Sequence, residues 1–133
     1  MGSKYHIDAA RIHPGVIALN TNFGLLPTPL MKEIRIALHK VGNDWTHESL
    51  GKEGERFIRA LARDSSQLGM LREVSISDSQ LRVTFGRAFS WMDVARTVIA
   101  YLQDAYHLEP PPKVTGLGIR AKVAELFRVN AVA

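Results

Sequence analysis

The chain has 133 residues, a formal net charge of +4 and no cysteine. This length fits one domain with its own core, and a composition of 46% hydrophobic and 23% charged residues excludes a disordered chain. The lack of cysteine excludes a disulfide framework, a thiol nucleophile and a thiolate metal site. No apolar run reaches the roughly 18–20 residues of a membrane span, and the N-terminus lacks a signal-peptide core. We therefore expect a soluble, cytoplasmic protein.

The first third of the chain predicts one strand and one helix. Residues 1–15 are polar and mixed, and the apolar run 16–19 is long enough for a buried strand. Thr28 is a good N-cap, and Pro29 suits the first helical position. Apolar residues then recur at i, i+4, i+7, i+8 and i+11, which predicts a helix that ends at Gly42-Asn43. These apolar residues are Leu30, Ile34, Ala37, Leu38 and Val41.

A second helix, a β-hairpin and a third helix are predicted next. Apolar residues share one helix face from about residues 46–49 onwards, and the pattern breaks at 65–69. Two glycines in its first turns weaken this helix by roughly 1 kcal/mol each. Segments 74–77 and 81–85 alternate with period two around turn residues 78–80, which predicts the hairpin. Ser90 caps the third helix, whose apolar stripe is Val94, Val98, Tyr101, Leu102 and Ala105.

This order of elements predicts an α+β fold, a small antiparallel sheet of three strands with helices packed on one face. Three prolines at 110–112 stop the third helix and form a stiff spacer. Beyond it, a short amphipathic helix is predicted from Thr115 to Arg128, and we expect this tail helix to dock on a neighbouring subunit. The domain prediction is therefore a single α+β domain over 1–109, with the spacer and tail helix over 110–133. The tail face consists of Ile119, Val123, Leu126 and Phe127.

Residue spacing indicates no active site. None of the five histidines has a second histidine three or four residues away or carboxylates placed to complete a metal site. His47 and Glu48 are adjacent, so on a helix they would point about 100° apart. No serine lies in a nucleophile elbow. Gly116-Leu117-Gly118 does not follow a predicted strand and is a weak phosphate loop. We therefore expect no catalytic residue, no metal and no cofactor.

Three short stretches keep an order and spacing that are known from one enzyme family. The first runs from Leu19 through a polar loop to Thr28-Pro29, and the second is Gly42-Asn43 followed by Leu50-Gly51. The third and most specific is residues 81–87, which run without a gap into the Ser90 cap. Together they resemble the small domain of cysteine desulfurases, pyridoxal-phosphate enzymes of the class V aminotransferase type. In the second stretch, the chain departs from the family's proline and histidine, with Asp44 and Glu48 at those positions.

The resemblance implies the fold but not the activity. In the family, a large cofactor-binding domain separates the second stretch from the third, whereas here residues 63–71 join them. That domain would carry the Schiff-base lysine, the ring-binding residues and the sulfur-accepting cysteine, and the chemistry needs them. The resemblance also implies that Arg82 grips a carboxylate, because a guanidinium pairs both oxygens. The structural alternative is that Arg82 only pairs with a neighbouring acid.

Three classes of function follow from these observations. We expect first a non-catalytic interaction or assembly protein, most simply a homodimer, because loss of the large domain would expose apolar surface. The tail helix could provide the contact with a protein partner. The first alternative is a protein that binds a small anionic ligand, either a carboxylate or a phosphate, through Arg82, Arg87 and Asn22. The second is weak nucleic-acid binding, which ranks last because the positive charge is diffuse. The one tight basic cluster with aromatic residues is Arg82, Arg87, Phe85 and Phe89.

Overall fold

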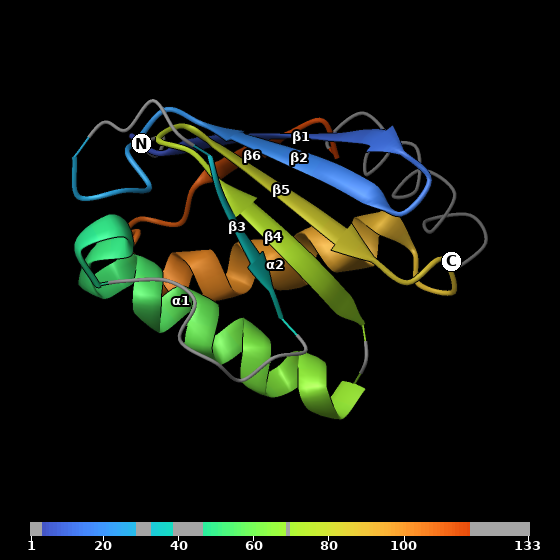
Figure 1. The fold of residues 1–133 in the computed structure, drawn as a ribbon. Coiled ribbons are helices and arrows are strands. Elements are labelled where there is room, and N and C mark those ends of the chain that lie inside the picture. Colours follow the sequence, from blue (N-terminus) through green and yellow to red (C-terminus); the bar gives the residue numbers. More distant parts are fainter. Residues whose placement is uncertain (1–3, 29–32, 39–46, 69, 118–133) are drawn as a thin grey trace.

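Two β-hairpins build the centre of a sheet in the computed structural model, which describes residues 4–28, 33–38, 47–68 and 70–117 (Figure 1). The first hairpin is β1 (His6–His13) with β2 (Val16–Thr21). The second is β4 (Leu71–Ile76) with β5 (Gln80–Phe85), as the alternation of the sequence predicts. Antiparallel pairing of β2 with β5 joins the two hairpins.

Two short strands complete the sheet at its edges. β3 (Ile34–Ala37) pairs antiparallel with β4, and β6 (Lys113–Thr115) pairs in parallel with β1. The strand order is β3-β4-β5-β2-β1-β6. The sheet is therefore six-stranded and mixed among the described residues, whereas three antiparallel strands were expected.

Both helices lie on one face of this sheet (Figure 1), and the predicted α+β class is confirmed. α1 (His47–Leu68) breaks at Gly51, where φ is 71° and the ring of Pro27 packs against the glycine. α2 (Trp91–Ala105) begins after Ser90, as predicted, although the Ser90 side chain makes no capping hydrogen bond. The apolar stripes of the helices and the inward residues of the strands form one core. Its largest fully buried side chains include Phe57, Ile58 and Leu61 of α1, Leu102 of α2, and Ile7, Ile17, Leu19, Ile76 and Leu81 of the strands.

The helix predicted from Thr28 to Val41 is wrong over residues 34–37, which form β3; 29–32 and 39–46 lie outside the described residues. Ile34 is half-buried, while Ile36 and Leu38 are buried, so the side chains alternate with period two. The same residues fit the helical spacing i and i+4, which is why the pattern is ambiguous. Pairing with β4 decides in favour of the strand, and the Leu38 N–H continues it by donating to the Arg72 carbonyl at 2.8 Å.

The sequence pattern also missed the two strands at the other edge. In β1 only Ile7 and Ala9 are buried, so most of the strand shows no alternation. After the three prolines the chain returns to the sheet as β6, and Leu117 is buried. Residues 113–117 therefore pack on the domain predicted for 1–109, with β6 in its sheet and Leu117 in its core, and their expected extension away from that domain is wrong. The tail helix predicted from Thr115 to Arg128 is wrong at Thr115, which is the last residue of β6, and residues 118–128 lie outside the described residues.

Tyr106 ties the end of α2 to the loop after β2. Its hydroxyl donates to the Leu25 carbonyl at 2.6 Å, and its ring meets that of Phe57 edge-on at 6.2 Å between centroids. A Cβ at Gly54 would lie 3.2 Å from this hydroxyl, so the glycine allows the close approach. Burial, and to a lesser degree the charge of Glu53, raises the pKa of Tyr106 well above its usual value of 10.0.

Tyr106→Phe is expected to lower the free energy of unfolding by about 1–2 kcal/mol, because the Leu25 carbonyl loses its donor. Since the folded-state pKa of Tyr106 is raised, its contribution is complete below about pH 10 and declines above it, where the unfolded chain ionises first. The difference in the free energy of unfolding between the wild-type chain and Tyr106→Phe should therefore narrow as the pH rises above about 10. Urea titrations from about pH 8 to 11 measure this, and a gap that widens would contradict the prediction.

Candidate functional site

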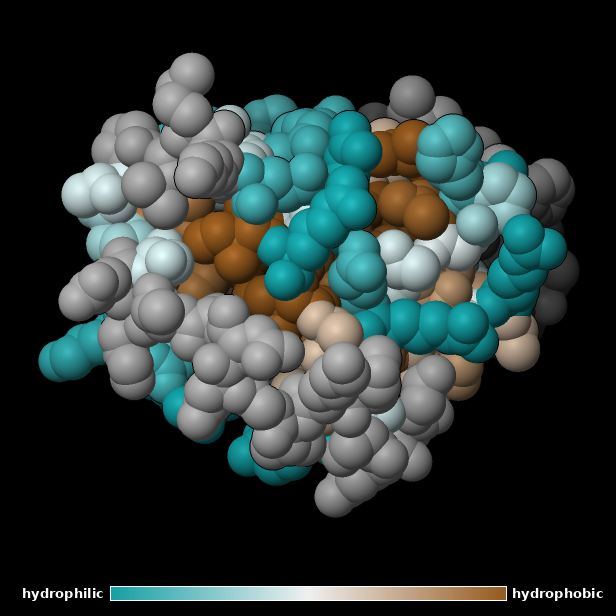
Figure 2. Space-filling model, viewed as in Figure 1, coloured by the Kyte–Doolittle hydropathy of each residue, from teal (hydrophilic) through white to brown (hydrophobic). Residues whose placement is uncertain are grey.

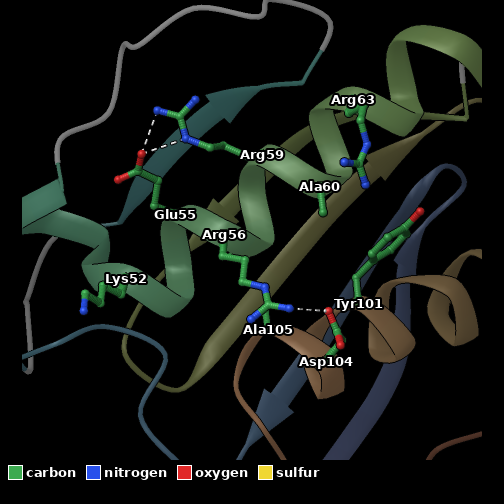
Figure 3. A pocket seen from close by; sticks show the side chains of 9 residues that line it. All are labelled: Lys52, Glu55, Arg56, Arg59, Ala60, Arg63, Tyr101, Asp104 and Ala105. Carbon is green, nitrogen blue, oxygen red and sulfur yellow. Dashed lines mark hydrogen bonds and ion pairs between the residues drawn. The ribbon is translucent and has the colours of Figure 1, made fainter.

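The exposed face of α1 carries a series of four basic residues. Lys52, Arg56, Arg59 and Arg63 follow one another at i, i+4, i+7 and i+11, a spacing that places them on one side of the helix. At 1.5 Å per residue the series is about 16 Å long. It lines a groove beside α1 and α2, and in Figure 3 the side chains of Arg56 and Arg63 point toward α2, whereas Arg59 points to the other side of α1 with Glu55. We call this the α1–α2 groove.

Two of the arginines are held by carboxylates. The Nε and Nη2 atoms of Arg59 each lie 2.7 Å from Oε1 of Glu55, whose side chain is only 8% exposed. Nη2 of Arg56 donates to Oδ2 of Asp104 across the groove at 3.2 Å (Figure 3). The second pair is well exposed, so it contributes little stability. Its effect is to hold a guanidinium over the groove.

Small and aromatic side chains complete the groove. Its volume is about 640 Å³, and Ala60 of α1 and Ala105 of α2 lie in its lining. Tyr101 of α2 lies at the same end as Arg63 (Figure 3). The lining contains four cationic side chains and two carboxylates, which leaves a formal charge of +2. The groove therefore combines a row of basic side chains with a small residue, Ala60, that another backbone can approach closely.

The structure does not bring the three predicted anion-binding residues together. Arg82 projects from β5, where its Nε donates to Oε1 of Gln80 at 3.2 Å. Asn22 follows β2 and binds the N-terminal strand, accepting from the His6 N–H at 2.7 Å. Arg87 follows β5. Because β2 and β5 are antiparallel, the end of one lies beside the start of the other, and Asn22 and Arg87 are at opposite ends of the sheet.

Sequence reasoning missed the basic series of α1. The positive charge is spread along the chain, but within it Lys52, Arg56, Arg59 and Arg63 have the spacing of one helix face. The contribution of α2 could not be seen in the same way. Tyr101 and Asp104 reach the groove only because α2 packs beside α1.

The described residues contain neither a candidate metal site nor a helix that could span a membrane. Within 4–28, 33–38, 47–68 and 70–117, no group of three histidine and carboxylate side chains could hold a metal ion. In those same ranges, no helix is long and apolar enough to cross a membrane. Comparisons with protein-family models, with curated proteins and with solved structures found no match. Function is therefore inferred from the site itself.

Proposed function

We propose that this chain is a non-catalytic interaction protein that binds an acidic helix of a partner protein in the α1–α2 groove. The observation that carries the proposal is the exposed basic series of Lys52, Arg56, Arg59 and Arg63 along one side of that groove. The resemblance to the small domain of cysteine desulfurases supports the same class of function. A small domain without its cofactor domain keeps surfaces for contact but not the catalytic groups.

The geometry of the series suits a helix. Its successive steps along the axis are about 6, 4.5 and 6 Å, and a second helix that carries Asp or Glu at i, i+4, i+7 and i+11 has the same steps. Ala60 is small and half-buried, so a partner backbone can lie close to α1 there, whereas Ala105 is buried. The Arg56–Asp104 pair orients one guanidinium over the groove in advance, which reduces the ordering that binding requires.

The charge of the groove favours a helix over a nucleic acid. A net charge of +2 over about 16 Å is one charge per about 8 Å, whereas double-stranded DNA carries one per about 1.7 Å. Glu55 and Asp104 lower the net positive charge of the groove, so it attracts a dense polyanion less strongly than four cationic side chains alone would. An acidic helix with a few carboxylates matches this density better, because charge complementarity gives specificity at such a surface.

The test uses a synthetic helical peptide of about 18 residues, or five turns, with four glutamates at i, i+4, i+7 and i+11. A second peptide of identical composition distributes the glutamates around the helix. Binding is measured by fluorescence anisotropy over a range of salt concentrations. We expect the first peptide to bind at least about tenfold more tightly, since only its charges can meet the series together.

Charge reversal then identifies the surface. The double variant Lys52→Glu and Arg56→Glu should weaken binding of the first peptide at least about tenfold. A charge-matched control, Arg35→Glu with Arg96→Glu, changes arginines that do not line the groove and should stay within about twofold. Equal binding of both peptides would overturn the proposal. Tighter binding of a single-stranded oligonucleotide, lost in the groove variant, would instead support a nucleic-acid function.

The expected homodimer stays a prediction. Among the described residues, Ile12 at 37% is the only large hydrophobic side chain that is exposed. Figure 2 shows a band of hydrophilic residues between two apolar areas on one face of the molecule. This surface does not by itself favour a second copy as the partner. Light scattering of the free protein gives its mass in solution and tests the dimer directly.

A further inference from the structure

A second basic hollow lies at the end of the sheet where β1 turns into β2. Its volume is about 380 Å³, and its lining includes Arg72, Thr84 and Arg87 together with Gly15 of the turn. It shares no residue with the α1–α2 groove. We call it the β-turn hollow.

Irregular pairing brings the two arginines to this hollow. The register of β4 on β5 shifts between Leu71 and Glu73, so Arg72 is the extra residue of a bulge, and bulges re-aim side chains. On the other side, the Phe85 N–H donates to the Gly15 carbonyl at 2.9 Å, which holds the turn against the end of β5. Gly15 has φ of 81°, and a Cβ there would lie 3.9 Å from Cγ of Arg87.

The positive charge of Arg72 and Arg87 is not balanced by an acidic residue in the lining of the β-turn hollow. None of its lining residues is acidic. Within the described part of the chain, neither Arg72 nor Arg87 forms an ion pair, whereas Arg56 and Arg59 do. The nearest acid by register is Glu73, which pairs with Thr84 across the strands but does not line the hollow. The two guanidiniums therefore concentrate positive charge beside a hydroxyl donor.

We propose that the β-turn hollow binds the phosphate group of a phosphomonoester. A phosphate has a charge of about −1.5 to −2 and three acceptor oxygens, which match two guanidinium forks and the Thr84 hydroxyl. A carboxylate has only two oxygens, and one arginine can satisfy both. The volume of about 380 Å³ falls within the range of small-ligand pockets, so it also has room for the esterified group. This site does not depend on the proposed function of the α1–α2 groove.

The β-turn hollow differs in composition from the anion site that the sequence predicts. Arg87 belongs to both sets, while Arg72 and Thr84 take the places of Arg82 and Asn22. The sequence could not show this grouping, because the bulge at Arg72 and the turn at Gly15 belong to different hairpins.

The experiment is a titration of the whole chain followed by NMR, using backbone amides and the arginine Nε–H signals. The probes are inorganic phosphate, glycerol 3-phosphate and acetate at equal ionic strength. The pH is about 8, where a phosphomonoester is a dianion because its second pKa is about 6. We expect saturable shifts at Arg72, Thr84 and Arg87 with both phosphates, tighter binding of glycerol 3-phosphate, and no saturation with acetate.

Variants locate the site. Arg72→Gln and Arg87→Gln should each weaken glycerol 3-phosphate binding at least about tenfold, since each removes one charged fork. Glu73→Gln should tighten it about two- to threefold by removing a nearby negative charge. Arg35→Gln is the matched control, because its exposed guanidinium lies 3.9 Å from Glu33 and outside the hollow. The three arginines are exposed and Glu73 is half-buried, and unchanged amide spectra elsewhere establish that the variants fold.

Three results would overturn the proposal. The first is a lack of saturable shifts with either phosphate. The second is binding that Arg72→Gln and Arg87→Gln leave unchanged, which would place the anion elsewhere. The third is inorganic phosphate binding as tightly as glycerol 3-phosphate, which would make the hollow a site for free phosphate and remove the ester from the proposal.

Discussion

Replacing Gly116 by valine is expected to detach β6 from β1 and to lower the free energy of unfolding by at least about 3 kcal/mol. Gly116 has φ of 89°, a conformation that a β-branched residue adopts only under strain. A Cβ at this position would overlap the Ala9 carbonyl oxygen and lie 2.7 Å from the Ala9 carbonyl carbon. Backbone atoms in the middle of a paired strand cannot move aside, so β6 must leave.

The interactions that hold β6 on the sheet set the size of this effect. The Lys113 N–H donates to the Tyr5 carbonyl at 2.9 Å, and the Thr115 hydroxyl donates to Oδ1 of Asp8 at 2.7 Å. Each such hydrogen bond contributes about 1 kcal/mol. Leu117 is only 6% exposed, and burying a leucine contributes about 1.5–3 kcal/mol.

Urea unfolding measures the loss of stability, and hydrogen exchange at the amides of β1 and β6 shows where it occurs. Lys113→Val is the control, because this side chain is exposed and its replacement should change the free energy by about 0.5 kcal/mol or less. If Gly116→Val keeps the protection of the Lys113 amide, the predicted detachment is wrong.

Phe57→Ala is the second large change, with an expected loss of about 3–5 kcal/mol. The ring is fully buried in the core and meets the ring of Tyr106 edge-on. Removing it costs its burial and leaves a cavity under α1, because a packed core relaxes only in part. The α1–α2 groove lies on the other side of the same helix turn, so the loss should also weaken the acidic peptide's binding near the unfolding transition.

The control for this variant is its neighbour. Arg56→Ala removes a large side chain that is 56% exposed, and its expected cost is below about 1 kcal/mol. Thermal unfolding followed by circular dichroism compares the two proteins. A loss of less than about 1 kcal/mol for Phe57→Ala would mean that the core closes over the missing ring, contrary to the prediction.

The candidate sites were predictable to different degrees. The basic series of α1 depends on one helix, so its spacing can be read from the sequence once the helix is predicted. Arg87 was also a candidate from the sequence. Its companions were not, since Arg72 enters the β-turn hollow through a bulge and Thr84 through its place on β5. The set of Arg82, Arg87 and Asn22 failed as one site because antiparallel pairing separates its ends.

The sequence by itself determined α1, α2 and the β4–β5 hairpin, because periodicity, turn residues and a helix start at Ser90 depend on neighbours a few positions away. Tertiary structure decided β1, β3 and β6. Residues 34–37 fit two periodicities until they pair with β4, and β6 is three residues long and needs β1 beside Gly116. Such strands obtain their hydrogen bonds from distant segments of the chain, so local residue patterns carry little information about them.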